Sequence, residues 1–274
     1  MEPITVGFST CAPVGVGCAS MNYFKDSKNA GTRKVAGYMA PFFDGVDVEP
    51  IIVPKGKTKK GYSTGNRNFR CANLNPAKEE QRRRLVRDAP RGTVLELYAG
   101  KGYLTRGVYA KAAKRVILVD KDKKALGQAD RKLKGRVRRE IYVGDNREWI
   151  REKMVDVDLD DLVAVDFDAF GRPMETMSEF FENYKVRRPL YVSLTDGSAM
   201  FYSFHRNTDG PSSAKKYYHS RLNKKEQGTV SGQVKMINRF MKEEGRRHGF
   251  TMEPISIAKG RQKTLYVGYL LKPT

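Results

Sequence analysis

Two closely spaced glycines and an acidic residue mark the segment VLELYAGKGYLT at residues 94–105. Gly100 and Gly102 would let the backbone turn tightly and approach a ligand that a Cβ atom would obstruct. A dinucleotide-binding loop would carry a third glycine three residues later, where this chain has Thr105. Glu96 comes just before the turn, and a carboxylate there would attract a ligand with a positive end and repel a pyrophosphate. The segment therefore predicts a cofactor loop that is not of the nicotinamide or flavin type.

Acidic and amide side chains also follow the next two apolar runs. Asp120 closes the run 115–120, and a carboxylate at that point can accept both hydroxyl protons of a ribose. Asp145 and Asn146 follow the run 140–143, where they could accept hydrogen bonds from an exocyclic adenine amine. Each acid alone is typical of a strand end or a helix cap. In register at successive edges of an open sheet, they predict a site for an adenosine group.

A third group of reactive side chains lies in VDFDAFGRP at residues 165–173. The exocyclic amine of a nucleobase is a poor nucleophile because its lone pair is delocalised into the ring. Asp168 could accept hydrogen bonds from such an amine and aim the lone pair, and Phe170 could stack on the base. Asp166 is a second candidate acceptor, although either acid could be a plain helix cap and Phe170 could belong to the core. The catalytic candidates are therefore Asp168, Phe170 and Asp166.

The elements that must position these residues alternate regularly along the chain. Apolar runs typical of strands lie at residues 93–98, 115–120, 140–143, 162–167 and 190–195. Helical patterns separate them at residues 104–114, 124–133, 147–154 and 174–184. This order predicts an α/β fold whose parallel sheet is covered by helices on both faces. A helix is expected over 230–247, and the runs 251–257 and 263–271 have too short a link for a crossover, so they predict an antiparallel hairpin.

Together these features resemble the class I S-adenosylmethionine-dependent methyltransferases. The resemblance covers about residues 76–272 and rests on the E-x-x-x-G-x-G loop, the acid after the second strand, the GDN step at 144–146 and the terminal hairpin. It implies a Rossmann-like seven-stranded mixed sheet and S-adenosyl-L-methionine as cofactor, with the methionyl moiety at the loop, the ribose at Asp120 and the adenine at Asp145 and Asn146. The cofactor-binding residues expected in this way are Glu96, Tyr98, Ala99, Gly100, Gly102, Asp120, Asp145 and Asn146.

The segment DAFGRP at 168–173 is similar to the D-P-F-G-S-P motif of the tRNA guanine-N2 dimethyltransferase family. Ala169 and Arg172 depart from that motif, and SLTDG at 193–197 is similar to the family's T-x-T-D segment. The resemblance implies methylation of an exocyclic amine, with guanine N2 of a tRNA-like RNA as the favoured target and Arg172 and Pro173 near the substrate. DNA amino-methyltransferases use a related motif at the same place, so adenine N6 or cytosine N4 of DNA is an alternative target.

The charge balance points to a polyanionic partner. The 274 residues include 52 Lys+Arg and 31 Asp+Glu, which gives a formal net charge of +21 at pH 7. Residues 50–78 and 210–225 contain no acid and mix cations with aromatic residues, as suits phosphate contact and base stacking. The substrate-binding candidates there are Arg67, Arg70, Lys215 and Lys216. A solvated basic tail is the plain alternative, and a nucleic-acid-binding protein without turnover would also carry such a charge.

Two regions differ in composition. Residues 1–75 are rich in Gly, Pro, Ser, Asn and Lys and have no helical period, so they predict a basic N-terminal extension that contacts substrate, ahead of a catalytic domain at 76–274. The three cysteines and three histidines match no zinc spacing, so we expect no structural metal. The N-terminus lacks a basic segment before its apolar residues, and no apolar run is long enough to span a bilayer. We expect a cytoplasmic protein that binds nucleic acid and no membrane.

Overall fold

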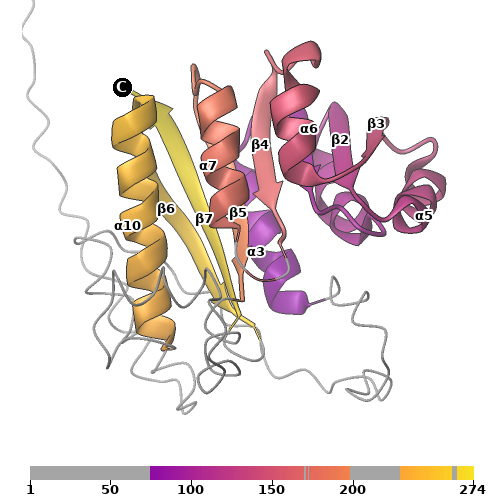
Figure 1. Cartoon of the computed structure of the whole chain (residues 1–274). Helices are drawn as coiled ribbons and strands as arrows, with labels where there is room; N and C mark the ends of the chain where they lie inside the picture. The colour runs from indigo at the N-terminus through magenta and orange to yellow at the C-terminus, as the bar shows by residue number, and fades with distance from the viewer. Residues whose placement is uncertain (1–74, 170, 172, 198–228, 261–263) are drawn as a thin grey trace, which may run out of the picture.

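A seven-stranded mixed sheet forms the centre of the molecule (Figure 1). The computed structural model describes residues 75–169, 171, 173–197, 229–260 and 264–274. The strands lie in the order β3-β2-β1-β4-β5-β7-β6. The first five strands are mutually parallel, whereas β7 pairs antiparallel with both β5 and β6. The predicted Rossmann-like sheet with its C-terminal antiparallel hairpin is therefore confirmed.

The strands lie close to the runs expected from the sequence. They are β1 (Thr93–Leu97), β2 (Arg115–Asp120), β3 (Arg138–Val143), β4 (Leu162–Phe167), β5 (Leu190–Asp196), β6 (Phe250–Lys259) and β7 (Leu265–Pro273). The helices are α3 (Pro76–Arg87), the π-type helix η2 (Thr105–Tyr109), α4 (Ala110–Ala112), α5 (Lys123–Leu133), α6 (Asn146–Glu152), the 3₁₀ helix η3 (Met154–Asp156), α7 (Met174–Asn183) and α10 (Val230–His248). Among the described residues, no helix combines the length and apolar character needed to cross a membrane.

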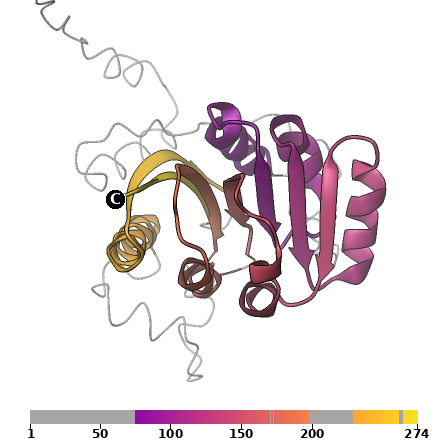
Figure 2. The ribbon, with the colours of Figure 1, turned by 90° about the horizontal axis from the view of Figure 1, so that it is seen from above.

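Helices cover both faces of the sheet, as the view from above shows (Figure 2). On one face, α6, α7 and α10 pack over a large apolar cluster contributed by β1, β4, β5 and β7. The other face carries a smaller apolar cluster beneath η2 and α5. Helix α3 lies on this second face over β5, β6 and β7. Because the faces differ in this way, one holds most of the apolar core and the other has room for polar groups.

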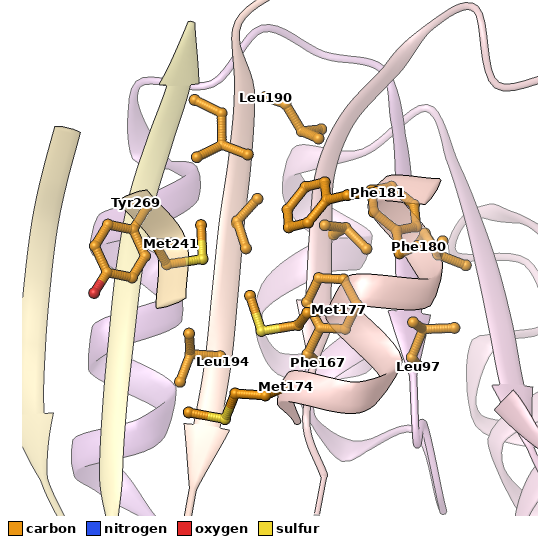
Figure 3. Packing of buried hydrophobic residues seen from close by; sticks show 14 of the residues in the cluster. Leu97, Phe167, Met174, Met177, Phe180, Phe181, Leu190, Leu194, Met241 and Tyr269 are labelled. Atoms are coloured by element: carbon orange, nitrogen blue, oxygen red, sulfur yellow. The ribbon is translucent and has the colours of Figure 1, made fainter. Parts of the chain in front are cut away.

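The larger cluster is built from long apolar side chains of the strands and of the helices in front of them (Figure 3). Phe180 of α7 packs edge-on against Phe167 of β4, with 5.6 Å between the ring centroids. The hydroxyl of Tyr269 in β7 donates a hydrogen bond of 2.5 Å to Asn238 Oδ1 of α10, so this buried phenol is satisfied. Backbone pairing sets the register of β1, β4 and β5, and the carboxyl ends of β4 and β5 lie at the lower side of the sheet in Figure 1.

The hydrophobic pattern does not predict helix α3. Asn75 caps it by accepting a 3.0 Å hydrogen bond from the Ala77 amide, and Pro76 occupies the first helical position. Half of its buried positions are polar, namely Lys78, Gln81 and Arg82. A Cβ atom on Gly268 of β7 would lie 2.5 Å from Gln81 Nε2. The glycine therefore allows α3 to approach the sheet closely, and the polar side chains must find partners there.

Candidate functional site

The predicted cofactor loop leaves the end of β1 through three residues with positive φ. These are Tyr98 at 62°, Gly100 at 54° and Gly102 at 64°. A Cβ atom on Gly102 would lie 2.7 Å from Ala129 Cβ of α5, so this glycine is needed for packing as well as for backbone conformation. Ala99 is fully buried in the loop. The loop therefore lies tightly between the sheet edge and α5.

Asp120 ties this loop to the end of β2. Its Oδ2 accepts a hydrogen bond of 2.8 Å from the Gly100 amide, and its Oδ1 accepts one of 2.8 Å from the Asp122 amide. A carboxylate has about four acceptor positions, so two amide donors leave capacity for a ligand. The side chain is only partly buried. The structure thus brings Gly100 and Asp120 together at the sheet edge.

Asp145 and Asn146 follow β3 and make local contacts of two kinds. Asp145 caps α6 by accepting a 2.9 Å hydrogen bond from the Arg147 amide, and the residue is exposed. Asn146 is buried, and its Oδ1 accepts a 3.0 Å hydrogen bond from the Tyr98 amide. The Tyr98 hydroxyl in turn lies 2.5 Å from Thr176 Oγ1 of α7. The ends of β1 and β3 are therefore connected directly through side chains.

A row of polar residues crosses five strands on the face that α3 covers. Adjacent strands place Glu96 beside Asp166, Asp166 beside Ser193, Ser193 beside Gly268, and Gly268 beside Ser256. All the side chains of this polar row are buried. Buried polar groups require hydrogen-bond partners, and α3 supplies most of them. Gln81 donates to Ser256 Oγ at 2.9 Å and accepts from Ser193 Oγ at 3.1 Å.

Asp166 lies in the middle of the polar row and is held by an arginine. Arg82 Nη2 lies 2.8 Å from Asp166 Oδ1, and Arg82 Nε lies 3.2 Å from Asp166 Oδ2. The Tyr109 hydroxyl donates a further hydrogen bond of 2.6 Å to Oδ2. Arg82 and Asp166 are both completely enclosed, so this is a bidentate ion pair away from water. These contacts give Asp166 a structural role.

Asp168 lies just beyond the end of β4, next to the polar row. Lys78 Nζ of α3 lies 2.5 Å from its Oδ2, and Thr195 Oγ1 of β5 donates a 2.7 Å hydrogen bond to its Oδ1. Burial raises the pKa of Asp168, the ammonium of Lys78 opposes that rise, and the charge of Asp166 adds to it. Asp168 thus lies at the carboxyl edge with one cationic partner, in a position that differs from that of Asp166.

Glu96 of β1 lies at the end of the polar row, next to η2. Its Oε2 accepts a hydrogen bond from the Thr105 hydroxyl, and its Oε1 is buried with no hydrogen-bond partner among the described residues. Burial raises the pKa of Glu96 well above its usual value, and the neighbouring charge of Asp166 raises it further. The sequence predicts Glu96 as a charged attractor for a positive ligand, whereas burial beside Asp166 disfavours its ionised form.

The remaining predicted residues divide into two groups. Pro173 is buried directly before α7, and Gly171 accepts a 2.7 Å hydrogen bond from the Gly197 amide, which joins the segments after β4 and β5. The other candidates lie outside the described residues; they are Arg67, Arg70, Phe170, Arg172, Lys215 and Lys216. Nearly all of the predicted extension 1–75 also lies outside the described residues.

Sequence reasoning missed Lys78 and the structural role of Arg82. The available signal was the Asn-Pro pair at positions 75 and 76, which is typical of a helix start. It was obscured because lysine, glutamine and arginine occupy inward-facing positions of α3, where the hydrophobic pattern expects apolar residues.

Replacement of Arg82 by methionine should lower the free energy of unfolding by about 3–5 kcal/mol, because Asp166 would be left buried without its charge partner. Arg83→Met is the matched control, since Arg83 pairs with Glu79 at the surface. The control should lose no more than about 1 kcal/mol. Urea denaturation of both variants measures the difference, and equal losses would contradict the assigned role of Arg82.

Glu96→Gln should change the pH dependence of stability. A carboxyl group whose pKa is raised by folding holds a proton that the unfolded chain releases above about pH 4.5. The free energy of unfolding of the wild type should therefore fall relative to that of Glu96→Gln as pH rises above that value, by up to about 1.4 kcal/mol per pH unit. Urea denaturation from pH 4 to 8 measures this, with exposed Glu148→Gln as control. Parallel curves for all three proteins would refute the assignment.

Comparison with known proteins gives a result at the level of the fold. No protein-family model and no curated protein matches the sequence. Among solved structures, Trm1 from Pyrococcus horikoshii in complex with S-adenosyl-L-methionine has a TM-score of 0.51 at 15% identity, over 72% of this chain and 54% of that chain. This chain therefore matches only about half of the length of Trm1.

Two further similar structures are M. jannaschii TYW2 in complex with AdoMet and the N-methyltransferase NodS from Bradyrhizobium japonicum in complex with S-adenosyl-L-homocysteine. TYW2 has a TM-score of 0.45 at 16% identity, over 73% of this chain and 77% of that chain. NodS has a TM-score of 0.46 at 14% identity, over 74% of this chain and 90% of that chain. On the strand order and the match to Trm1, this chain has the fold of the class I S-adenosylmethionine-dependent methyltransferases.

Proposed function

We propose that this chain is an S-adenosyl-L-methionine-dependent methyltransferase that transfers a methyl group to an exocyclic amine of a nucleic-acid base. The favoured target is RNA, at guanine N2 of a tRNA-like substrate. The observation that carries the proposal is the convergence of two groups at one sheet edge. The Gly100 loop with Asp120 follows β1 and β2, and Asp168 follows the neighbouring strand β4. Ligands of open α/β sheets bind at this edge.

The residues at the edge fit the proposed cofactor. Asp120 is partly exposed and keeps acceptor capacity beyond the two amides it already binds, as recognition of a ribose requires. Asp145 presents an exposed carboxylate after β3. When bound, S-adenosyl-L-methionine would supply an electrophilic methyl group on a sulfonium. Asp120 would hold the ribose hydroxyls, and the backbone around Gly100 would lie against the methionyl part.

Asp168 is proposed as the catalytic acceptor for the substrate amine. Lys78 and Thr195 occupy two of its roughly four acceptor positions, so an amine could bind a remaining one without displacing either. A hydrogen bond from the amine to a carboxylate orients its nitrogen lone pair toward the methyl donor. Transfer would form an N–C bond and break the S–CH₃ bond of the donor, which would leave a neutral thioether, and the proton that the amine loses would pass to Asp168.

Lys78 is proposed as a positioning residue for Asp168. The side chain is buried, and its ammonium is 2.5 Å from the carboxylate. It opposes the rise in the pKa of Asp168 that burial produces, so it favours the ionised acceptor. Because Lys78 lies on α3, the docking of that helix on the sheet also fixes the direction of the carboxylate.

A nucleic acid is proposed as substrate because of the net charge of +21, since a cation excess of this size suits a polyanionic partner. The motif similarity at 168–173 favours an amine as the methyl acceptor.

Methyl transfer from radiolabelled S-adenosyl-L-methionine to unmodified bulk tRNA, rRNA and DNA tests the proposal. Asp168→Asn should lower the transfer rate by about 10²–10⁴-fold while cofactor binding persists. Asp120→Asn should weaken cofactor binding by about tenfold or more, because a charged acceptor is lost. Exposed Asp156→Asn is the control and should behave as the wild type. Nucleoside analysis should find the label in N2-methylguanine.

Label in N6-methyladenine or N4-methylcytosine of DNA would support methylation of an exocyclic amine but would show that the substrate is DNA and not RNA. Absence of transfer to every pool, together with absence of cofactor binding by calorimetry, would refute the enzyme proposal and favour a binding protein without turnover.

Lys78→Met should raise the pKa of Asp168 further, because an opposing positive charge is removed. The acidic limb of the pH–rate profile should therefore move to higher pH, while Lys78→Arg should keep it near the wild-type position. An unchanged limb in Lys78→Met, with the fold intact by circular dichroism, would show that Lys78 does not act through Asp168.

A further inference from the structure

An excess of positive charge lies in a part of the chain that the proposed site does not use. Residues 101–139 contain fourteen lysines and arginines and only three acids. All three acids are engaged: Asp120 binds the Gly100 amide, Asp122 caps α5, and Asp130 pairs with Arg139 at 2.5 Å. They therefore do little to neutralise the remaining cations around them.

Six of these cations lie on α5 and on the chain that leads from it into β3. We call them the α5 basic face; they are Lys123, Lys124, Arg131, Lys134, Arg136 and Arg138. Each is exposed, and none forms an ion pair within the described part of the chain. The helix turns its apolar residues, such as Leu126 and Ala129, toward the sheet. Its cations therefore lie on the solvent side.

Two arginines on the opposite face of the sheet are paired with nearby acids. Arg147 of α6 pairs with Glu175 and with Glu179 of α7, each at 3.3 Å, and Arg151 pairs with Glu179 at 3.2 Å. Exposed cations without an ion pair in the described ranges also occur at Lys153, Lys185, Arg187 and Arg188, so the α5 basic face is distinguished by its density of charge, with fourteen cations and three acids in residues 101–139. Such an excess points to a partner that brings its own negative charge.

The position of this face suits an extended polyanion. Helix α5 begins three residues after Asp120, at the edge where the proposed cofactor site lies, and ends near the start of β3 at the other edge. Together with β3 it forms the end of the molecule opposite α10 and β6 (Figure 1). Its eleven residues span about 16 Å, along which one nucleic-acid strand presents about five phosphates.

We propose that the α5 basic face binds backbone phosphates of the nucleic-acid substrate and thereby holds the substrate beside the sheet edge. This proposal rests on the proposed function for its choice of partner, but binding can be measured without cofactor or turnover. An alternative role for such cations is to prevent an exposed edge strand from pairing with another chain, and this role would explain Arg138, because β3 is an edge strand. It would not explain the cations of α5, which lie on a helix.

A charge-neutralised variant tests the proposal. It combines Arg131→Gln, Lys134→Gln, Arg136→Gln and Arg138→Gln, all remote in sequence from the Gly100 loop. The matched control removes the same charge from exposed, unpaired cations elsewhere in the described ranges, with Lys153→Gln, Lys185→Gln, Arg187→Gln and Arg188→Gln. Filter binding of bulk tRNA and of a duplex DNA of similar length, at several salt concentrations, gives the affinities. Vesicles containing phosphatidylserine form a third arm.

The first variant should bind tRNA at least about tenfold more weakly at 0.1 M salt, and the slope of log affinity against log salt should be shallower by about three to four. The control should change affinity less than about threefold. Equal losses in both variants, no loss in the first, or tighter wild-type binding to vesicles than to either nucleic acid would overturn the proposal. Cofactor binding, measured separately by calorimetry, should be the same in the first variant and in the wild type. If the wild type binds tRNA as expected but binds no cofactor, the proposed function fails while the role of the α5 basic face stands.

Discussion

The buried ion pair between Arg82 and Asp166 is the interaction on which the arrangement of this site depends. It joins helix α3, which precedes the sheet in the chain, to the middle of β4 with two hydrogen bonds in fixed geometry. Desolvating both charges is costly, so the pair is favourable only with further hydrogen bonds such as that from Tyr109. It therefore specifies one orientation of α3 on the sheet more than it adds to stability.

That orientation has a consequence for the proposed chemistry. Lys78 lies one turn before Arg82 on the same helix and contacts Asp168, two residues beyond Asp166. The contact between α3 and β4 thus positions two ion pairs: Arg82 with Asp166 in the interior, and Lys78 with Asp168 at the sheet edge. Thr195 contacts both Arg82 and Asp168, so the two pairs share a partner. Groups coupled in this way should respond together to the loss of any one of them.

Charge is used in two ways in this molecule. Inside, three acids of the sheet and two cations of α3 lie close together, and burial and neighbouring charges raise the pKa values of Glu96 and Asp168. Outside, the α5 basic face is exposed and suits binding that weakens with salt. The enclosed groups orient the reacting amine in the proposed mechanism, and the exposed groups hold the polymer that carries it.

The sequence by itself determined the fold class, the strands and most helices, because apolar periodicity and glycine spacing are local signals. The hydrogen bond between Gly100 and Asp120 came from the tertiary structure. Only the tertiary structure separated Asp166 from Asp168 and showed Glu96 among buried acids. It also revealed α3, whose inward-facing Lys78, Gln81 and Arg82 look like surface residues in sequence. The reason is physical: whether a polar side chain lies in solvent or in a buried pair depends on partners far away in the chain, as Lys78 depends on Asp168, ninety positions later.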